Sequence, residues 1–205
     1  MNGFVVVVLQ ATFLVFLIFT VAAYTILAER RIIARMQARL GPNRVGPFGM
    51  FQPLADVIKL LTKEEIRSAG ASRWLHVVTP ILTLVPVMLV FAVIPAGPSL
   101  HLADVSIGYL FVAAVSSIGV YGVVLGGWSS NSKYALLGGL RSSAQLISYE
   151  LAQGLAALGV IAATGSLSLV RIVEAQFPLP FAIVQPIGFL VFVIASIAEA
   201  SRAPF

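Results

Sequence analysis

Long apolar stretches limit the folds open to this chain more than any other feature. Crossing the hydrocarbon core of a bilayer as a helix takes roughly 20 apolar residues. Five segments reach about that length, namely residues 4–28, 75–95, 107–128, 142–164 and 181–198. The fifth contains Pro186, which interrupts helical hydrogen bonding. We therefore expect an all-α membrane protein with about five spanning helices.

The overall composition agrees with a membrane location. Hydrophobic residues make up 59% of the 205 residues and the mean hydropathy is +1.00. A soluble domain of this size cannot bury so much apolar surface. Residues 1–205 are expected to form a single membrane domain. The first apolar stretch has no positive leader and is longer than the core of a signal peptide, so we expect an uncleaved anchor.

The basic residues predict how the chain crosses the membrane. Nine of the 13 Lys and Arg residues lie in the connection 29–74, none lies between the second and third spans, and two lie between the third and fourth. Arg171 and Arg202 follow the fourth and fifth spans. Basic loops stay on the cytoplasmic side. The N-terminus is therefore predicted outside, with loops one and three in the cytoplasm or matrix. The charge of +5 follows this topology, so no nucleic-acid partner is expected.

The first loop contains an amphipathic segment at residues 53–63. Its apolar side chains recur at helical spacing, and its charged ones fall on the other face: Leu54, Val57, Ile58 and Leu61 against Asp56, Lys59 and Lys63. We predict a helix that lies along the membrane surface or roofs a cavity. Residues 169–174 suggest a shorter version on the outer side.

Three glycines and two prolines punctuate residues 41–49, directly after a basic stretch. They prevent helix formation and predict a stiff, shaped loop. The alternative is an ordinary topogenic loop. Phosphate-binding glycine spacings are absent.

Polar residues interrupt the fourth span. They are Gln145, Ser148, Tyr149, Glu150 and Gln153, with Arg141 at the entrance. A carboxylate near the middle of a bilayer costs on the order of 3 kcal/mol, so Glu150 is a candidate for proton transfer. Gln145, Tyr149 and Gln153 recur every fourth residue and predict one wet stripe, with Glu150 about 100° away from Tyr149. The alternative is a neutral, hydrogen-bonded structural glutamate.

Charged residues also gather where the first and fifth spans end on the same predicted side. Glu199 and Arg202 are three residues apart and are predicted to pair across a helical turn, while Glu29 and Arg30 lie at the matching level. With Asp56, they predict a charged vestibule. The alternative is a set of surface ion pairs of little consequence.

Other residue types carry less chemistry. The chain has no cysteine, so disulfides and iron–sulfur ligation by this chain are excluded. His76 and His101 stand singly, and no metal site is predicted. Gly122 and Gly126 form a G-x-x-x-G pattern that favours close helix packing.

Several strings together resemble one family. They are Glu29-Arg30-Arg31, residues 41–47, residues 52–56 with Lys59 and Lys63-Glu64, residues 127–134, Ser148-Tyr149-Glu150, Ala198-Glu199, and Arg202-Ala203-Pro204-Phe205. The sequence resembles, in order and along its length, the N-terminal part of the membrane subunit of respiratory complex I called subunit 1. That family continues beyond the last of these strings, so we expect this sequence to be truncated relative to it.

The resemblance implies a function as well as a fold. Members of that family form the entrance of the quinone tunnel in a proton-pumping NADH:quinone oxidoreductase. Quinone would be the substrate, with Arg30, Asp56 and Lys59 at its site. The ionisable residues beneath the tunnel would be Glu29, Asp56, Glu150, Glu199, Arg141 and Arg202. The location would be the bacterial plasma membrane or the mitochondrial inner membrane.

The resemblance also implies partners. NADH, FMN and iron–sulfur clusters would reside in other subunits, among them the soluble subunits that complete the quinone site and carry the terminal cluster. Small membrane subunits would lead to antiporter-like subunits. Three alternatives remain: the membrane anchor of an energy-converting hydrogenase, a free-standing secondary transporter, and a purely structural helix bundle. No internal repeat supports the transporter, and the polar residues of the fourth span argue against the structural bundle.

Overall fold

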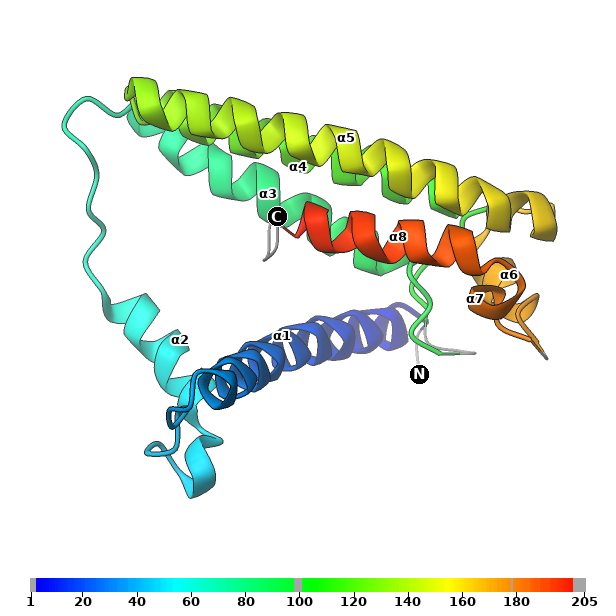
Figure 1. Cartoon of the computed structure of the whole chain (residues 1–205), viewed down its shortest axis with the longest axis horizontal. Helices are drawn as coiled ribbons and strands as arrows, with labels where there is room; N and C mark the ends of the chain where they lie inside the picture. The colour runs from blue at the N-terminus through cyan, green and yellow to red at the C-terminus, as the bar shows by residue number, and fades with distance from the viewer. Residues whose placement is uncertain (1–2, 98–100, 178, 201–205) are drawn as a thin grey trace. The chain divides into compact units, whose positions relative to one another are not determined.

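The computed structural model describes residues 3–97, 101–177 and 179–200. Every regular element within them is helical, which confirms the predicted all-α class (Figure 1). The chain divides into two compact units, Met1–Arg67 and Ser68–Phe205.

The first unit is built from two helices. α1 (Gly3–Met36) runs beyond the predicted apolar span, because residues 29–36 are mostly good helix formers although they are charged. A short turn, η1 (Pro47–Gly49), precedes α2 (Gln52–Thr62), which packs against α1. The position of α2 confirms the predicted amphipathic helix.

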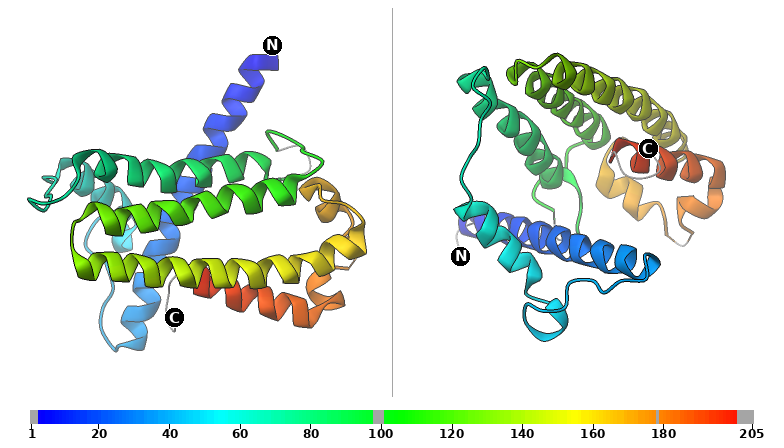
Figure 2. Two further views of the ribbon diagram at one scale, coloured as in Figure 1. Left: turned by 90° about the horizontal axis from the view of Figure 1, so that it is seen from above. Right: turned by 60° about the vertical axis from the view of Figure 1, so that its left-hand side comes forward.

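The second unit is a row of helices that follow one another in chain order. α3 (Arg73–Val93) packs on α4 (Gly108–Ser129), which packs on α5 (Lys133–Thr164), and α5 packs on α8 (Pro186–Glu199) (Figure 2). Only residues 130–132 separate α4 from α5, so these helices form an antiparallel hairpin. α6 (Leu169–Glu174) confirms the short helix predicted there.

The fifth predicted span is not one continuous helix. It is divided at Gln185 into α7 (Phe181–Val184) and α8, because Pro186 disfavours helical backbone in the residue before it. Gln185 adopts φ −128° and ψ 66°, and its side-chain amide donates to the backbone carbonyl of Gly159 on α5 at 2.9 Å. The 14 residues of α8 extend about 21 Å, less than the roughly 30 Å of bilayer hydrocarbon.

Glycines let α3 and α4 approach closely. A Cβ atom on Gly122 would lie 2.4 Å from Cγ2 of Thr83, and one on Gly126 would lie 3.1 Å from Cγ2 of Thr79. Both threonines belong to α3. The predicted role of the G-x-x-x-G pattern in close packing is therefore confirmed.

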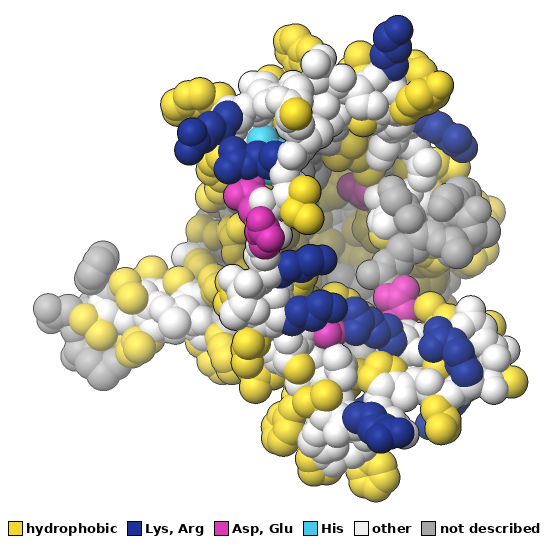
Figure 3. All heavy atoms as spheres, turned by 90° about the vertical axis from the view of Figure 1, so that its left-hand side faces the viewer, with side chains coloured by type: hydrophobic (Ala, Val, Ile, Leu, Met, Phe, Trp, Pro, Cys, Tyr) yellow, Lys and Arg dark blue, Asp and Glu magenta, His cyan; other side chains and the backbone are white. Residues whose placement is uncertain are grey.

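Four helices are long and apolar enough to cross a membrane: α1, α3, α4 and α5. Few of their side chains are buried, and large hydrophobic residues such as Phe16, Leu151 and Leu155 are exposed. Hydrophobic side chains cover much of the visible face in Figure 3. Such a surface suits lipid or partner subunits rather than water.

Candidate functional site

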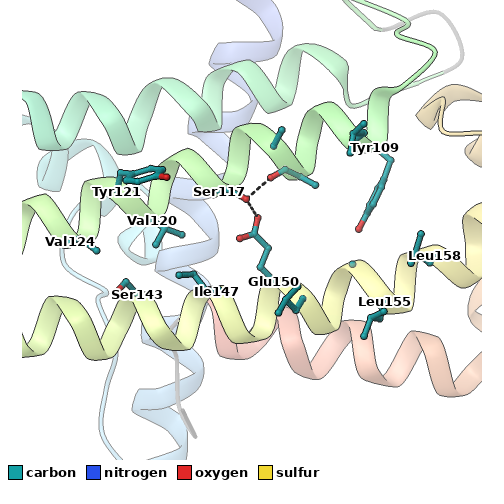
Figure 4. Close-up of a pocket in the computed structure, with 15 residues that line it drawn as sticks. Tyr109, Ser117, Val120, Tyr121, Val124, Ser143, Ile147, Glu150, Leu155 and Leu158 are labelled. Carbon is teal, nitrogen blue, oxygen red and sulfur yellow. Dashed lines mark hydrogen bonds between the residues drawn. The ribbon is translucent and has the colours of Figure 1, made fainter.

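An apolar groove between α4 and α5 holds the carboxyl group of Glu150. The groove has a volume of about 760 Å³, and Glu150 carries the only charged side chain among its described lining residues (Figure 4). Tyr109 and Tyr121 from α4 line the same groove. The remaining lining residues are small or apolar: Leu110, Ala113, Ala114, Ser117, Val120, Val124, Ser143, Ile147, Leu151, Gly154, Leu155 and Leu158.

Two consecutive serines of α4 bind this carboxylate. Oε1 of Glu150 accepts hydrogen bonds from Ser117 Oγ at 2.6 Å and from Ser116 Oγ at 3.0 Å. The distances are those of strong O–H···O bonds. Our sequence analysis missed both serines, although two adjacent hydroxyl residues in an otherwise apolar span were a usable signal. Glu150 is thus held toward α4.

The other polar residues of α5 face a different neighbour. Gln145 donates to the backbone carbonyl of Ala198 at 2.8 Å, and Gln153 donates to Glu199 Oε2 at 2.5 Å and to Ser196 Oγ at 3.2 Å. Both glutamines therefore bind α8, as their shared face predicts, while Glu150 lies apart from them. The helix α5 thus carries two separate polar clusters.

In the first unit, Arg30 of α1 and Asp56 of α2 form an ion pair. Arg30 Nη1 lies 2.6 Å from Asp56 Oδ2, and Gln52 Nε2 donates to Oδ1 at 3.0 Å. The Gln52 hydrogen bond and then the Arg30 guanidinium lower the pKa of Asp56 below its ordinary 3.8, with a smaller contribution from the charge of Lys59. Asp56 is therefore held as a carboxylate.

This ion pair borders a small apolar pocket of about 160 Å³. Besides Arg30, Gln52 and Asp56, its lining consists of Ala23, Ile26, Leu27, Pro53, Val57 and Leu60. The pocket combines an apolar wall with a fixed pair of opposite charges at its edge.

The loop between α1 and η1 has the rigid shape predicted for it. Gly49 has φ 77° and its missing Cβ would lie 2.4 Å from the carbonyl oxygen of Pro42. Gly46 has φ 72° and a Cβ there would meet the ring of Phe51. The guanidinium of Arg31 donates to the carbonyl of Phe48, which ties α1 to the loop. Only glycine fits both positions.

The remaining predicted site residues are distributed over both units. Glu29 on α1 and Glu199 on α8 are half-buried, whereas Lys59 on α2 and Arg141 on α5 are exposed. Arg202 and its predicted pair with Glu199 lie outside the described residues. A vestibule that joins Glu29 and Asp56 to Glu150 and Glu199 involves both units and stays a prediction. Within the described residues there is no group of three or more potential metal ligands among His, Asp and Glu.

Comparison with known proteins gives the family. Residues 9–205 match a family model described as NADH dehydrogenase. The chain is 54% identical to the NADH-quinone oxidoreductase H-type subunit numbered 1 of Geobacter metallireducens and to the H-type subunit numbered 2 of Geobacter sulfurreducens, in each case over 93% of this chain and 60% of the relative. It is 47% identical to the NADH-quinone oxidoreductase H-type subunit numbered 2 of Syntrophobacter fumaroxidans, over 99% of this chain and 64% of the relative.

This chain thus spans about three fifths of the length of these relatives. The matched region includes α2, the Arg30–Asp56 pair and the groove that holds Glu150. The four long apolar helices make the chain an integral membrane protein. Because the family model matches nearly all of its residues, the chain belongs to the NADH dehydrogenase family.

Proposed function

We propose that this chain is a membrane subunit of a proton-translocating NADH:quinone oxidoreductase. In that complex it forms the entrance of the quinone tunnel and couples quinone reduction to proton translocation. The names of its relatives support the assignment to the complex. The observation that carries the coupling role is the Glu150 carboxyl, held by two serine hydroxyls in an apolar groove between two membrane-length helices.

The proton path runs through ionisable groups near the membrane. A carboxyl group in an apolar groove is costly, and such groups normally serve ion or proton movement. Glu150 is the member of this path that the contacts describe best. The others are Glu29, Asp56 and Glu199, with Arg141 and Arg202 providing positive charge.

The quinone site lies beside α2. A quinone has an apolar ring and tail and two polar carbonyl oxygens, and it therefore needs an apolar wall with a few fixed polar groups. The pocket of about 160 Å³ beside Arg30 and Asp56 has this character. Lys59, one turn beyond Asp56 on α2, adds positive charge near it. The pocket holds part of the quinone, and partner subunits complete the site.

Electrons reach this quinone from partner subunits. The chain has no cysteine and carries no iron–sulfur ligands of that kind. NADH, FMN and the iron–sulfur clusters reside in other subunits, and small membrane subunits link this chain to antiporter-like subunits. The N-terminus faces outward and the basic loops face the cytoplasm or matrix, in a bacterial plasma membrane or mitochondrial inner membrane.

The substitution Glu150→Gln in the assembled complex tests the coupling role. Glutamine keeps the size of the side chain but cannot exchange a proton. We expect quinone reduction and proton pumping to fall at least tenfold, a loss typical of removing a proton-transfer group. Unchanged rates of both would contradict the proposal. The matched control is Glu174→Gln on α6, which removes an exposed carboxylate remote in sequence from the groove and should leave both rates intact.

Membership of the complex is tested separately by purification. The full-length protein is tagged in its native membrane, extracted in mild detergent and assayed for NADH-dependent quinone reduction. Inhibitor-sensitive activity that follows the tag supports the proposal. Recovery of the protein alone, or with hydrogenase partners and no such activity, would overturn it.

A further inference from the structure

The two serines that bind Glu150 also lie beside a second acceptor. Ser117 Oγ lies 2.9 Å from the backbone carbonyl of Ala113, and Ser116 Oγ lies 3.0 Å from the same carbonyl. Figure 4 shows the Ser117 hydroxyl between that carbonyl and the Glu150 carboxylate. Each hydroxyl therefore touches one acceptor on its own helix and one on α5.

A hydroxyl group has a single hydrogen to donate and two lone pairs with which to accept. It cannot donate to Glu150 and to Ala113 at the same time. When Glu150 is ionised it can only accept, so the serine hydrogens point toward it. When Glu150 is protonated, its own O–H can donate to a serine oxygen, and that serine can turn its hydrogen to the Ala113 carbonyl.

We infer that Ser116 and Ser117 are positioning residues that keep Glu150 hydrogen-bonded in the same place in both of its protonation states. The inference deepens the proposed function, because it assumes that Glu150 gains and loses a proton during turnover. The proton enters the carboxylate from outside the pair and leaves by the same group. No serine O–H bond breaks, since each hydroxyl only rotates about its Cβ–Oγ bond.

The groove makes such an arrangement necessary. Its lining is apolar, so a carboxyl that lost its partners on changing charge would be left unsatisfied or would swing away. A pair of donors with an alternative acceptor avoids both results. Serine hydroxyls can serve as donor and acceptor alike, which alanine or valine at these positions could not do.

The other ionisable groups near Glu150 belong to three helices. Tyr109 and Tyr121 of α4 face the groove. On α5 itself, Tyr149 precedes Glu150 and Arg141 lies at the start of the span. Glu199 of α8 is bound by Gln153, on a part of α5 distinct from the groove. Among the described contacts, the two serines are the groups that bind the Glu150 carboxyl directly.

The test uses the complete complex with Ser116→Ala, Ser117→Ala and the double variant. Infrared difference spectra between low and high pH report the carbonyl stretch of protonated Glu150, which is identified by its loss in Glu150→Gln. We expect this band to move to higher frequency in the alanine variants because the protonated carboxyl loses a hydrogen-bond partner. We also expect the pH profile of quinone reduction to move upward by about one unit, a tenfold change in proton affinity, because the ionised form loses its donors.

Two controls separate this role from general damage. Ser116→Thr and Ser117→Thr retain the hydroxyl and should restore the band and the pH profile. Ser129→Ala removes a similar buried serine of α4, whose hydroxyl bonds to the carbonyl of Gly126 at 2.9 Å, and should change neither. If the double variant does not assemble, the single variants carry the same readouts.

The possible outcomes distinguish the inference from the proposed function. An unchanged band and an unchanged pH profile in the alanine variants would overturn the inference even if Glu150→Gln abolishes activity. A shifted band with full activity in Glu150→Gln would support the inference about the contacts and overturn the coupling role. A shift in both readouts, with loss of activity in Glu150→Gln, supports both.

Discussion

The guanidinium of Arg30 on α1 donates to the carboxylate of Asp56 on α2 across 2.6 Å, joining residues 26 positions apart in the sequence. Gln52, one turn before Asp56, donates to the second carboxylate oxygen at 3.0 Å. Both oxygens of Asp56 are thus occupied by donors. This arrangement fixes the amphipathic helix α2 to the end of α1 and places an ion pair beside an apolar pocket.

Replacing Asp56 by Asn should lower quinone reduction without changing its dependence on pH near neutrality. The donors lower the pKa of Asp56 below 3.8, so the group is already ionised at neutral pH. Its stabilising contribution is present above the ordinary carboxyl range and is lost only as the pH falls through the lowered pKa. We expect a fall in rate of about fivefold to tenfold from the lost charge-assisted hydrogen bond.

The measurement is the rate of quinone reduction in the complex between mildly acid and mildly alkaline pH. Loss of an inflection near neutral pH in Asp56→Asn would contradict the lowered pKa. The control is Glu64→Gln, which removes an exposed carboxylate just beyond α2 and should leave the rate unchanged.

Replacing Gly122 by Ala should separate α3 from α4. The added Cβ would lie 2.4 Å from Thr83 Cγ2, and the β-branched threonine has little freedom to move aside. We expect a loss of about 1–3 kcal/mol in stability, measured as a lower unfolding temperature of the purified complex in detergent. Thr83→Ser removes the clashing methyl group and should partly restore the stability of Gly122→Ala.

A second glycine of α4 provides the control for this prediction. Gly119 has open space where its Cβ would be, so Gly119→Ala should be neutral or stabilise the helix by up to about 1 kcal/mol. Equal effects of the two substitutions would show that helix propensity, rather than contact with α3, determines the result.

Hydropathy predicted the helices of this chain better than it predicted their ends. The apolar stretches, the amphipathic helix α2 and the short helix α6 all follow from spacing in the sequence. Hydropathy reports where lipid replaces water, however, and a helix can continue beyond that boundary. For this reason α1 extends to Met36 and α5 begins at Lys133, both in charged sequence.

The partners of Glu150 could not be derived from the sequence for a different reason. The helix α4 is apolar on all sides, so its sequence does not indicate which face meets α5. Ser116 and Ser117 gain their role only from the rotation of α4 in the packed row. The polar face of α5 was easier to predict, because Gln145 and Gln153 recur at helical spacing and both bind α8.

Replacing Gly49 by Ala should distort the loop that follows α1. Alanine would suffer both from the positive φ of 77° and from contact with the Pro42 carbonyl at 2.4 Å. We expect a loss of more than about 2 kcal/mol, read as reduced thermal stability and reduced quinone reduction of the complex. Gly165→Ala is the control, since Gly165 has φ 64° but nothing near its missing Cβ. That variant should lose only the roughly 1–2 kcal/mol of the left-handed backbone. If both variants lost the same amount, the contact with Pro42 would have no effect.

Gln153 and Gln145 both join α5 to α8, but only Gln153 binds a carboxylate. Its amide donates to Glu199 at 2.5 Å, whereas Gln145 donates to a backbone carbonyl at 2.8 Å. Hydrogen bonds to charged groups contribute about 1.5–3 kcal/mol and those between neutral groups about 1 kcal/mol. Replacement by Leu should therefore destabilise the complex more at position 153 than at position 145. If Glu199 belongs to the proton path, Gln153→Leu should also reduce proton pumping relative to quinone reduction, while Gln145→Leu should leave their ratio unchanged. Pumping and quinone reduction measured on the same vesicles give this ratio directly, and equal ratios in both variants would count against a role of Gln153 in holding Glu199 for proton transfer.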